Sequence, residues 1–149
     1  MPPLVFVGPP GEKTLLLERF IKKFRLQDNI FYLGPVSNNC LESLYKRAVV
    51  TIIASRYEGF GMAVLESMKR RIPALCSDLE VIREISGDAP VFFNPGDPFD
   101  FAQKLSDILN GSIDLRINTE LGFNISSRYS WERTAEEYLV VFQSLEKSL

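Results

Sequence analysis

The sequence contains no histidine. This absence excludes histidine acid–base catalysis, Ser-His-Asp triads and histidine-ligated metal sites within these residues. Cysteine is almost as scarce, because only Cys40 and Cys76 are present, far apart and in no metal-ligand pattern. We favour two buried thiols in a reducing compartment, and the sequence leaves a disulfide open as the alternative.

A long hydrophobic run and a strong charge of either sign are also absent. No apolar stretch approaches the roughly 20 residues that span a bilayer, and no segment has the pattern of a signal peptide. The formal net charge of -2 argues against a nucleic-acid backbone as the main partner. We therefore expect a cytoplasmic protein without a transmembrane segment that does not bind nucleic acid. Peripheral association with the inner face of the membrane stays open for a full-length enzyme.

The 149 residues have the composition of one globular domain, since 46% are hydrophobic and 24% are charged. Short apolar runs alternate with helical patterns, which is typical of a parallel α/β sheet. We predict a Rossmann-like domain over residues 1–149. Strands are expected at residues 4–7, 30–33, 49–54, 72–76 and 91–93. Helices are expected up to residue 25 and at 41–47, 62–70, 80–86, 98–109, 113–128 and 131–147.

Several local signals refine this prediction. Asp97 can cap the helix that begins with Pro98, and Ser130 can cap the last helix. The apolar stripe of that last helix is expected to pack on the sheet or on a domain outside these residues, and Trp131 is expected in the core. A doubly wound domain normally has another strand and phosphate-facing turn before a segment like residues 4–8, so we expect a truncated first unit.

Residues 8–14 (Gly-Pro-Pro-Gly-Glu-Lys-Thr) resemble a phosphate-binding P-loop. That motif requires a glycine directly before the lysine, whereas Glu12 stands there and brings a negative charge to the phosphate position. We therefore favour a turn followed by a capped amphipathic helix. A P-loop NTPase that depends on Lys13 is the less favoured alternative.

The segment from Glu58 to Glu66 is the best candidate site. Its backbone contains two glycines, Gly59 and Gly61, which permit close approach of a ligand. The free N–H groups of the following helix form an anion site. Glu58 stands on the loop above a strand's carboxyl end, where open α/β sheets bind ligands. A solvated glutamate and an ordinary glycine turn are the alternative interpretation of the same residues.

The Glu-x7-Glu pattern of Glu58 and Glu66 resembles the hallmark of the retaining glycosyltransferase family 4 (glycosyl transferases group 1). Further matches follow the family's order along essentially the whole chain. They include Leu-Val-Phe-Val-Gly at 4–8, Phe-Tyr-Leu-Gly-Pro-Val at 31–36, Pro-Gly-Asp at 95–97 and Tyr-Ser-Trp-Glu at 129–132. The resemblance implies the C-terminal, nucleotide-sugar-binding half of a GT-B fold.

The resemblance also implies roles for individual residues. Glu58 would hydrogen-bond the donor sugar as the catalytic residue, and Glu66 would hold the ribose hydroxyls. The backbone facing the sugar and diphosphate would be that of Gly59, Phe60, Gly61, Met62 and Ala63. The loop along the base would consist of Gly34, Pro35 and Val36. Transfer would retain the anomeric configuration and need no essential metal or other cofactor.

The sequence departs from the family at two places. The Arg and Lys that clamp the diphosphate have no counterpart here, and neither does the acceptor-binding domain. After the helix that contains Glu66, this sequence has Lys69-Arg70-Arg71 in place of the family's usual glycine. The glycine normally takes a left-handed conformation at the end of the helix, which Arg71 would adopt only at some cost. We favour solvated surface for this cluster over an added phosphate clamp.

The sequence therefore predicts a glycosyltransferase domain that binds a nucleotide-diphospho-sugar and transfers the sugar to a glycan, lipid-linked or small-molecule acceptor. Polysaccharide assembly is the expected setting, and the isolated residues are expected to be inactive. A non-catalytic nucleotide-sugar-binding module is the main alternative.

Overall fold

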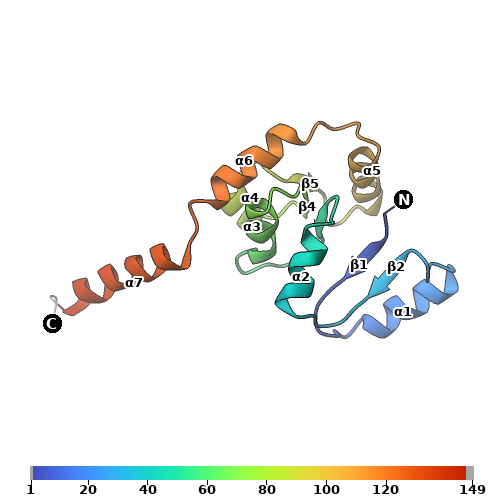
Figure 1. Ribbon diagram of the computed structural model, residues 1–149, viewed down its shortest axis with the longest axis horizontal. Helices are drawn as coiled ribbons and strands as arrows, with labels where there is room; N and C mark the ends of the chain where they lie inside the picture. The colour runs from blue at the N-terminus through green and yellow to red at the C-terminus, as the bar shows by residue number, and fades with distance from the viewer. Residues whose placement is uncertain (1, 147–149) are drawn as a thin grey trace. The chain divides into compact units, whose positions relative to one another are not determined.

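The computed structural model describes residues 2–146. Its contacts divide the chain into two compact units, Met1–Arg47 and Ala48–Leu149, which are described separately below. Figure 1 shows the order of the elements along the chain. Both units alternate parallel strands with helices, so the predicted α/β class with flanking helices is confirmed.

The N-terminal unit consists of β1 (Leu4–Phe6), α1 (Thr14–Lys23), β2 (Ile30–Tyr32) and α2 (Asn38–Tyr45). β1 and β2 pair in parallel, with Leu4 opposite Ile30. α2 begins earlier than the sequence pattern indicated, because the Ser37 hydroxyl caps it by accepting the Cys40 N–H at 3.3 Å. No residue of α1 is fully buried: Leu16 and Phe20 are exposed, and Leu17 and Ile21 are half-buried.

The C-terminal unit contains one parallel sheet in the order β3-β4-β5. Its elements are β3 (Thr51–Ile53), α3 (Met62–Lys69), β4 (Ala74–Ser77), α4 (Glu80–Ser86), β5 (Val91–Phe93), α5 (Pro98–Leu109), α6 (Arg116–Ser126) and α7 (Trp131–Glu146). Residue 147, the predicted end of the last helix, lies outside the described residues.

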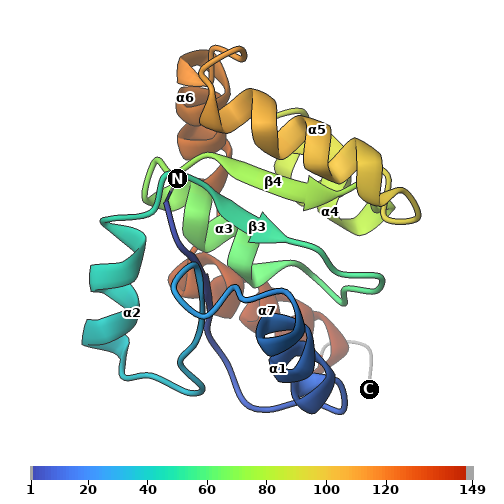
Figure 2. The same cartoon turned by 90° about the vertical axis from the view of Figure 1, so that its right-hand side faces the viewer.

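Two apolar clusters cover the two faces of this sheet. Cys76 faces a core that includes Val64 of α3 and Ile82 of α4. On the opposite face, Leu75 packs with Phe93 and with Ile108 of α5. Figure 2 shows α5 and α3 on opposite sides of the strands. Because successive side chains of β4 point to opposite faces, this central strand is buried on both.

The predicted helix caps are confirmed. The Asp97 carboxylate accepts the N–H groups of Phe99 and Asp100 at 2.9 and 3.2 Å, with Pro98 in the first turn. The Ser130 hydroxyl accepts the Arg133 N–H at 3.1 Å at the start of α7. These side chains satisfy amides that the helices leave unpaired.

One expectation about α7 is wrong and another is tested only in part. None of its described residues is buried, so its apolar stripe does not pack on the sheet, and packing on a domain outside these residues stays a prediction. Trp131 is 75% exposed rather than in the core. Within residues 2–146, no helix combines the length and apolarity needed to cross a membrane.

Candidate functional site

The loop between β3 and α3 lies at the carboxyl end of a strand, the position where open parallel sheets bind ligands. Gly61 ends this loop with φ 97°, and a Cβ there would lie 3.0 Å from Cδ1 of Ile85. Both the left-handed backbone and the close contact require glycine. At Gly59, by contrast, an added Cβ would meet nothing within 4 Å, so the space above this part of the loop is open.

Glu58 is half-buried on the loop and is oriented by a neighbour. The Ser55 hydroxyl donates to Oε1 of Glu58 at 2.7 Å, which fixes the direction of the carboxylate. Burial raises the pKa of the Cys76 thiol to about 12, and the negative charge of Glu58 adds to that increase. Glu58 therefore lies close enough to the carboxyl end of β4 to act on Cys76 through space.

The first turn of α3 presents backbone donors beside Glu58. Its N-cap is Gly61, which has no side chain, and the first turn contains no acidic residue. The amides of Met62 and Ala63 therefore receive no cap from their own helix. Both residues are exposed, and the positive end of the helix dipole lies at this turn.

Glu66 lies on α3 one turn after Met62. Residues four apart in a helix share a face, so the Glu66 side chain emerges on the same side as the exposed Met62. The residue is half-buried, and the Arg70 guanidinium donates to its carbonyl at 2.8 Å. The structure thus brings Glu58, the first-turn amides and Glu66 together along one short segment.

The other predicted residues, Gly34, Pro35 and Val36, follow β2 in the N-terminal unit. Gly34 adopts φ 67°, and its carbonyl accepts the Gly8 N–H at 3.0 Å. The Tyr32 hydroxyl donates to the Gly8 carbonyl at 3.0 Å, which ties the same turn to β2. The contact of these residues with a nucleotide base stays a prediction.

The segment that resembles a P-loop forms an ordinary turn into α1. The Gly11 N–H donates to the Thr14 hydroxyl at 2.9 Å, and the Thr14 N–H donates back to the Gly11 carbonyl at 3.0 Å. Lys13 is the N-cap and contributes no side-chain cap. The predicted turn and amphipathic helix are confirmed, although the hydroxyl of Thr14, one residue inside the helix, supplies the local hydrogen bond.

Arg71 connects the end of α3 to α6. It adopts φ 55°, the left-handed conformation that the sequence pattern flagged as costly. Its guanidinium lies 3.4 Å from the centre of the Phe123 ring, and Nε donates to Glu120 at 3.1 Å. Its side chain remains about half exposed. Arg71 therefore packs on a neighbouring helix at the surface, which gives the charge a structural use other than binding phosphate.

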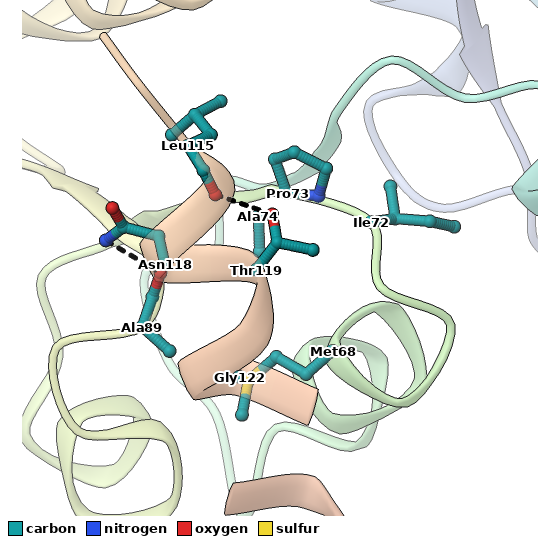
Figure 3. A pocket seen from close by; sticks show the side chains of 9 residues that line it. All are labelled: Met68, Ile72, Pro73, Ala74, Ala89, Leu115, Asn118, Thr119 and Gly122. Atoms are coloured by element: carbon teal, nitrogen blue, oxygen red, sulfur yellow. Dashed lines mark hydrogen bonds between the residues drawn. The ribbon is translucent and has the colours of Figure 1, made fainter. Parts of the chain in front are cut away.

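Small residues allow α6 to lie close to α3. Gly122 of α6 faces Met68 of α3, and these residues border a cavity of about 10 Å³ together with Ala74 and Ala89 (Figure 3). A cavity of this size holds at most one water molecule and cannot accept a sugar. The space between α3 and α6 is therefore filled by packed side chains.

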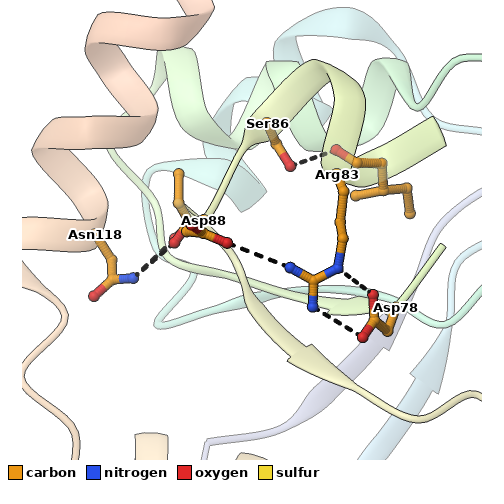
Figure 4. Close-up of polar contacts among 7 residues, drawn as sticks. Asp78, Arg83, Ser86, Asp88 and Asn118 are labelled. Atoms are coloured by element: carbon orange, nitrogen blue, oxygen red, sulfur yellow. Dashed lines mark hydrogen bonds and ion pairs between the residues drawn. The ribbon is translucent and has the colours of Figure 1, made fainter. Parts of the chain in front are cut away.

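The structure also shows a charged cluster that the sequence pattern did not reveal. Arg83 of α4 forms a bidentate ion pair with Asp78, which follows β4, and a second ion pair with Asp88 at 3.3 Å (Figure 4). Its guanidinium lies 4.2 Å from the centre of the Phe92 ring. Asp78 consequently has a pKa below its ordinary value, because the Arg83 hydrogen bond stabilises its charged form. Asp78 and Arg83 are five positions apart in the sequence, and no helix or strand periodicity predicts their contact.

A second unpredicted contact is aromatic. Phe60 in the loop and Tyr129 after α6 meet edge to face, with ring centroids 6.1 Å apart and an interplanar angle of 76°. The sequence separates these two rings by almost 70 positions, so no local pattern could indicate their contact.

Comparisons with known proteins converge on one family. The family described as "Glycosyl transferases group 1" matches residues 2–121. The O-antigen chain mannosyltransferase B of Escherichia coli is 28% identical over 143 residues, which cover 96% of this chain and 38% of that protein. The serotype-specific mannosyltransferase WbdA of Escherichia coli is 31% identical over 107 residues, or 71% of this chain and 13% of that protein.

Solved structures agree on the fold. A sucrose-phosphate synthase from Thermosynechococcus elongatus superposes with a TM-score of 0.85 at 20% identity, covering 98% of this chain and 39% of that one. The lipopolysaccharide outer core galactosyltransferase WaaB superposes with a TM-score of 0.73 at 17% identity, covering 95% of this chain and 41% of that one. The chain thus spans well under half the length of the relatives that it matches.

Proposed function

Because the chain belongs to the glycosyl transferases group 1 family, we propose that it is the donor-binding domain of a retaining glycosyltransferase. The donor is a nucleotide-diphospho-sugar, and the acceptor is a glycan, a lipid-linked sugar or a small molecule. The two Escherichia coli relatives are named mannosyltransferases, so a mannosyl donor and a polysaccharide acceptor are the first to test.

One observation supports this proposal most strongly. The Glu58 carboxylate, held by Ser55, stands beside the uncapped amides that open α3. A diphosphate needs donors and positive potential, and a sugar needs acceptors for its hydroxyls. The loop offers both at one strand end, where parallel sheets bind ligands.

In the proposed complex each group has a separate task. Glu58 accepts hydrogen bonds from the donor sugar, and Glu66 accepts them from the ribose hydroxyls. The amides from Gly59 to Ala63 face the sugar and the diphosphate. Negative charge grows on the diphosphate as the sugar departs, and these fixed dipoles stabilise it more in the transition state than in the ground state.

Other parts of the active enzyme are proposed to lie outside the residues described here. Among residues 2–146, β1 pairs with β2 alone and β3 pairs with β4 alone. A further strand–helix unit would supply the Arg and Lys that clamp the diphosphate, and a separate domain would bind the acceptor. Transfer is proposed to need no metal, so a chelator should leave the full-length enzyme's rate unchanged.

Thermal unfolding against a panel of UDP, GDP and ADP sugars tests the donor site. A ligand at 100 times its dissociation constant adds roughly 2.7 kcal/mol to the free energy of unfolding, which shifts the midpoint measurably. We expect a shift with one nucleotide class. Glu66→Ala should weaken that binding by roughly 1.5–3 kcal/mol, because the ribose hydroxyls lose a charged partner.

Glu136→Ala is a matched control, because it removes the same charge from an exposed position on α7. Equal nucleotide affinity in the wild type and in Glu66→Ala would show that the ribose assignment is wrong. In the full-length protein, Glu58→Ala should reduce turnover more than nucleotide affinity. A full-length protein that binds none of the donors would refute the proposed function.

A further inference from the structure

The edge-to-face pair of Phe60 and Tyr129 connects the candidate loop to the segment between α6 and α7. Phe60 is 43% exposed and Tyr129 is 37% exposed, so neither ring is fixed by burial in the core. Their contact at 6.1 Å and 76° has the geometry that aromatic rings favour. The two rings therefore contact each other at a partly solvent-exposed position.

The loop has little else to fix its backbone at this point. Gly59 has open space around it, and glycine imposes few limits on φ and ψ. A Cβ at Gly61 would lie 3.0 Å from Ile85, so the backbone at the start of α3 is closely packed, whereas that of Gly59 is not. Phe60 stands between these two glycines, so a restraint on its ring is a restraint on the peptide units on both sides.

Tyr129, by contrast, belongs to a well-anchored segment. Its N–H donates to the Ser126 carbonyl at 3.1 Å, continuing the end of α6. Ser126 is buried, and α6 packs against α3. The next residue, Ser130, caps α7. The backbone that carries the tyrosine ring is thus anchored to α6. α6 packs against α3, the helix that follows the loop.

We propose that Tyr129 is a positioning residue for the donor loop, acting through the Phe60 ring to hold the backbone amides between Gly59 and Ala63. The claim that Tyr129 restrains this backbone stands on the geometry alone. Its consequence for the diphosphate rests on the proposed function.

Amide hydrogen exchange of the 149-residue chain, measured without ligand, tests the restraint directly. In Tyr129→Ala, the N–H groups of Val64 and Leu65, which donate to the Gly61 carbonyl at the end of the loop, should exchange about two- to tenfold faster, the range expected from losing one aromatic pair. Tyr129→Phe keeps the ring and should exchange like the wild type. Tyr138→Ala is the matched control, because Tyr138 pairs with Phe142 on α7 instead.

Unchanged exchange at Val64 and Leu65 in a folded Tyr129→Ala variant would overturn the proposal, as would an increase of the same size in Tyr138→Ala. If Tyr129→Ala unfolds throughout, Tyr129→Leu replaces it, since leucine keeps apolar bulk without the edge-to-face geometry. Faster exchange confined to Val64 and Leu65 then supports the proposal, and uniform or unchanged exchange refutes it.

A second arm adds a nucleoside diphosphate to the same variants. The affinity should fall in Tyr129→Ala by the factor seen in exchange and should recover in Tyr129→Phe. If the wild type does not bind the nucleotide while the exchange result holds, the proposed function fails and the role of Tyr129 in holding the loop survives. If binding is normal in every variant and exchange is unchanged, the positioning role fails alone.

Discussion

Gly122 is the residue whose replacement most directly tests the packing of α6 on α3. A Cβ at this position would lie 2.9 Å from Cγ of Met68, 3.4 Å from Cβ of the same residue and 3.5 Å from Cβ of Ala89 (Figure 3). The first distance is shorter than carbon atoms tolerate without movement. Only Cβ separates Cγ from the backbone, so Met68 cannot relieve the overlap by moving only the end of its side chain.

The expected size of the effect follows from two opposing contributions. Replacing a helical glycine with alanine at an open position stabilises a protein by about 0.5–1 kcal/mol. Inserting a methyl group into a filled core costs about 1–3 kcal/mol, and the adjoining cavity of about 10 Å³ gives the methyl little room. Gly122→Ala should therefore lower the free energy of unfolding by about 1 kcal/mol.

Urea unfolding followed by far-UV circular dichroism measures this change as a shift of the midpoint at constant slope. Met68→Ala supplies the second background, because it removes Cγ, the atom that would lie 2.9 Å from the new methyl, and leaves the Cβ contacts at 3.4 and 3.5 Å. In that background Gly122→Ala should be neutral or stabilising, so the two substitutions should couple by about 1–3 kcal/mol. The packing argument would be refuted if Gly122→Ala raised the free energy of unfolding of the wild-type protein, or if it lowered that free energy equally in both backgrounds.

Three further predictions follow from the structure. Arg71→Gly should be about 1 kcal/mol more stable than Arg71→Ala in urea unfolding, because only glycine relieves the left-handed backbone; equal stabilities would contradict this. At pH 8, a thiol reagent should label exposed Cys40 in the native protein and spare Cys76, whose buried thiol has a pKa of about 12; equal labelling rates would show the burial to be wrong. Hydrogen bonds from Arg116 lower the pKa of Asp114 from 3.8 to about 2, so the stability from this pair is complete above pH 3.8 and is lost as the pH falls through 2. NMR titration of Asp114 should give that midpoint, and Arg116→Met should raise it.

Features set by neighbouring residues could be predicted from the sequence. The parallel α/β class follows from alternating apolar runs and helical patterns, and the caps at Asp97 and Ser130 follow from residue type and position. The same rule applied to Ser37 would have placed the start of α2 correctly. The carboxylate of Glu58 and the uncapped start of α3 could likewise be located, since both depend on one short segment.

Features that depend on distant partners could not be predicted. An apolar residue such as Trp131 is expected in a core, yet whether anything covers it depends on how α7 is placed. The cost of a left-handed conformation at Arg71 could be predicted, but the ring of Phe123 that its guanidinium contacts lies on another helix. The contact of Phe60 with Tyr129 joins two loops and leaves no periodic signal in the sequence.

The exposure of Trp131 has a practical consequence for spectroscopy. It is the only tryptophan in the chain, and it stands in water at the first position of α7 rather than among the core residues. Its fluorescence will therefore start with the red-shifted emission of a hydrated indole and will change little when the sheet melts. Conversely, this indole is a built-in reporter for whatever surface comes to cover α7, because burial of the ring would shift its emission to the blue without any added label.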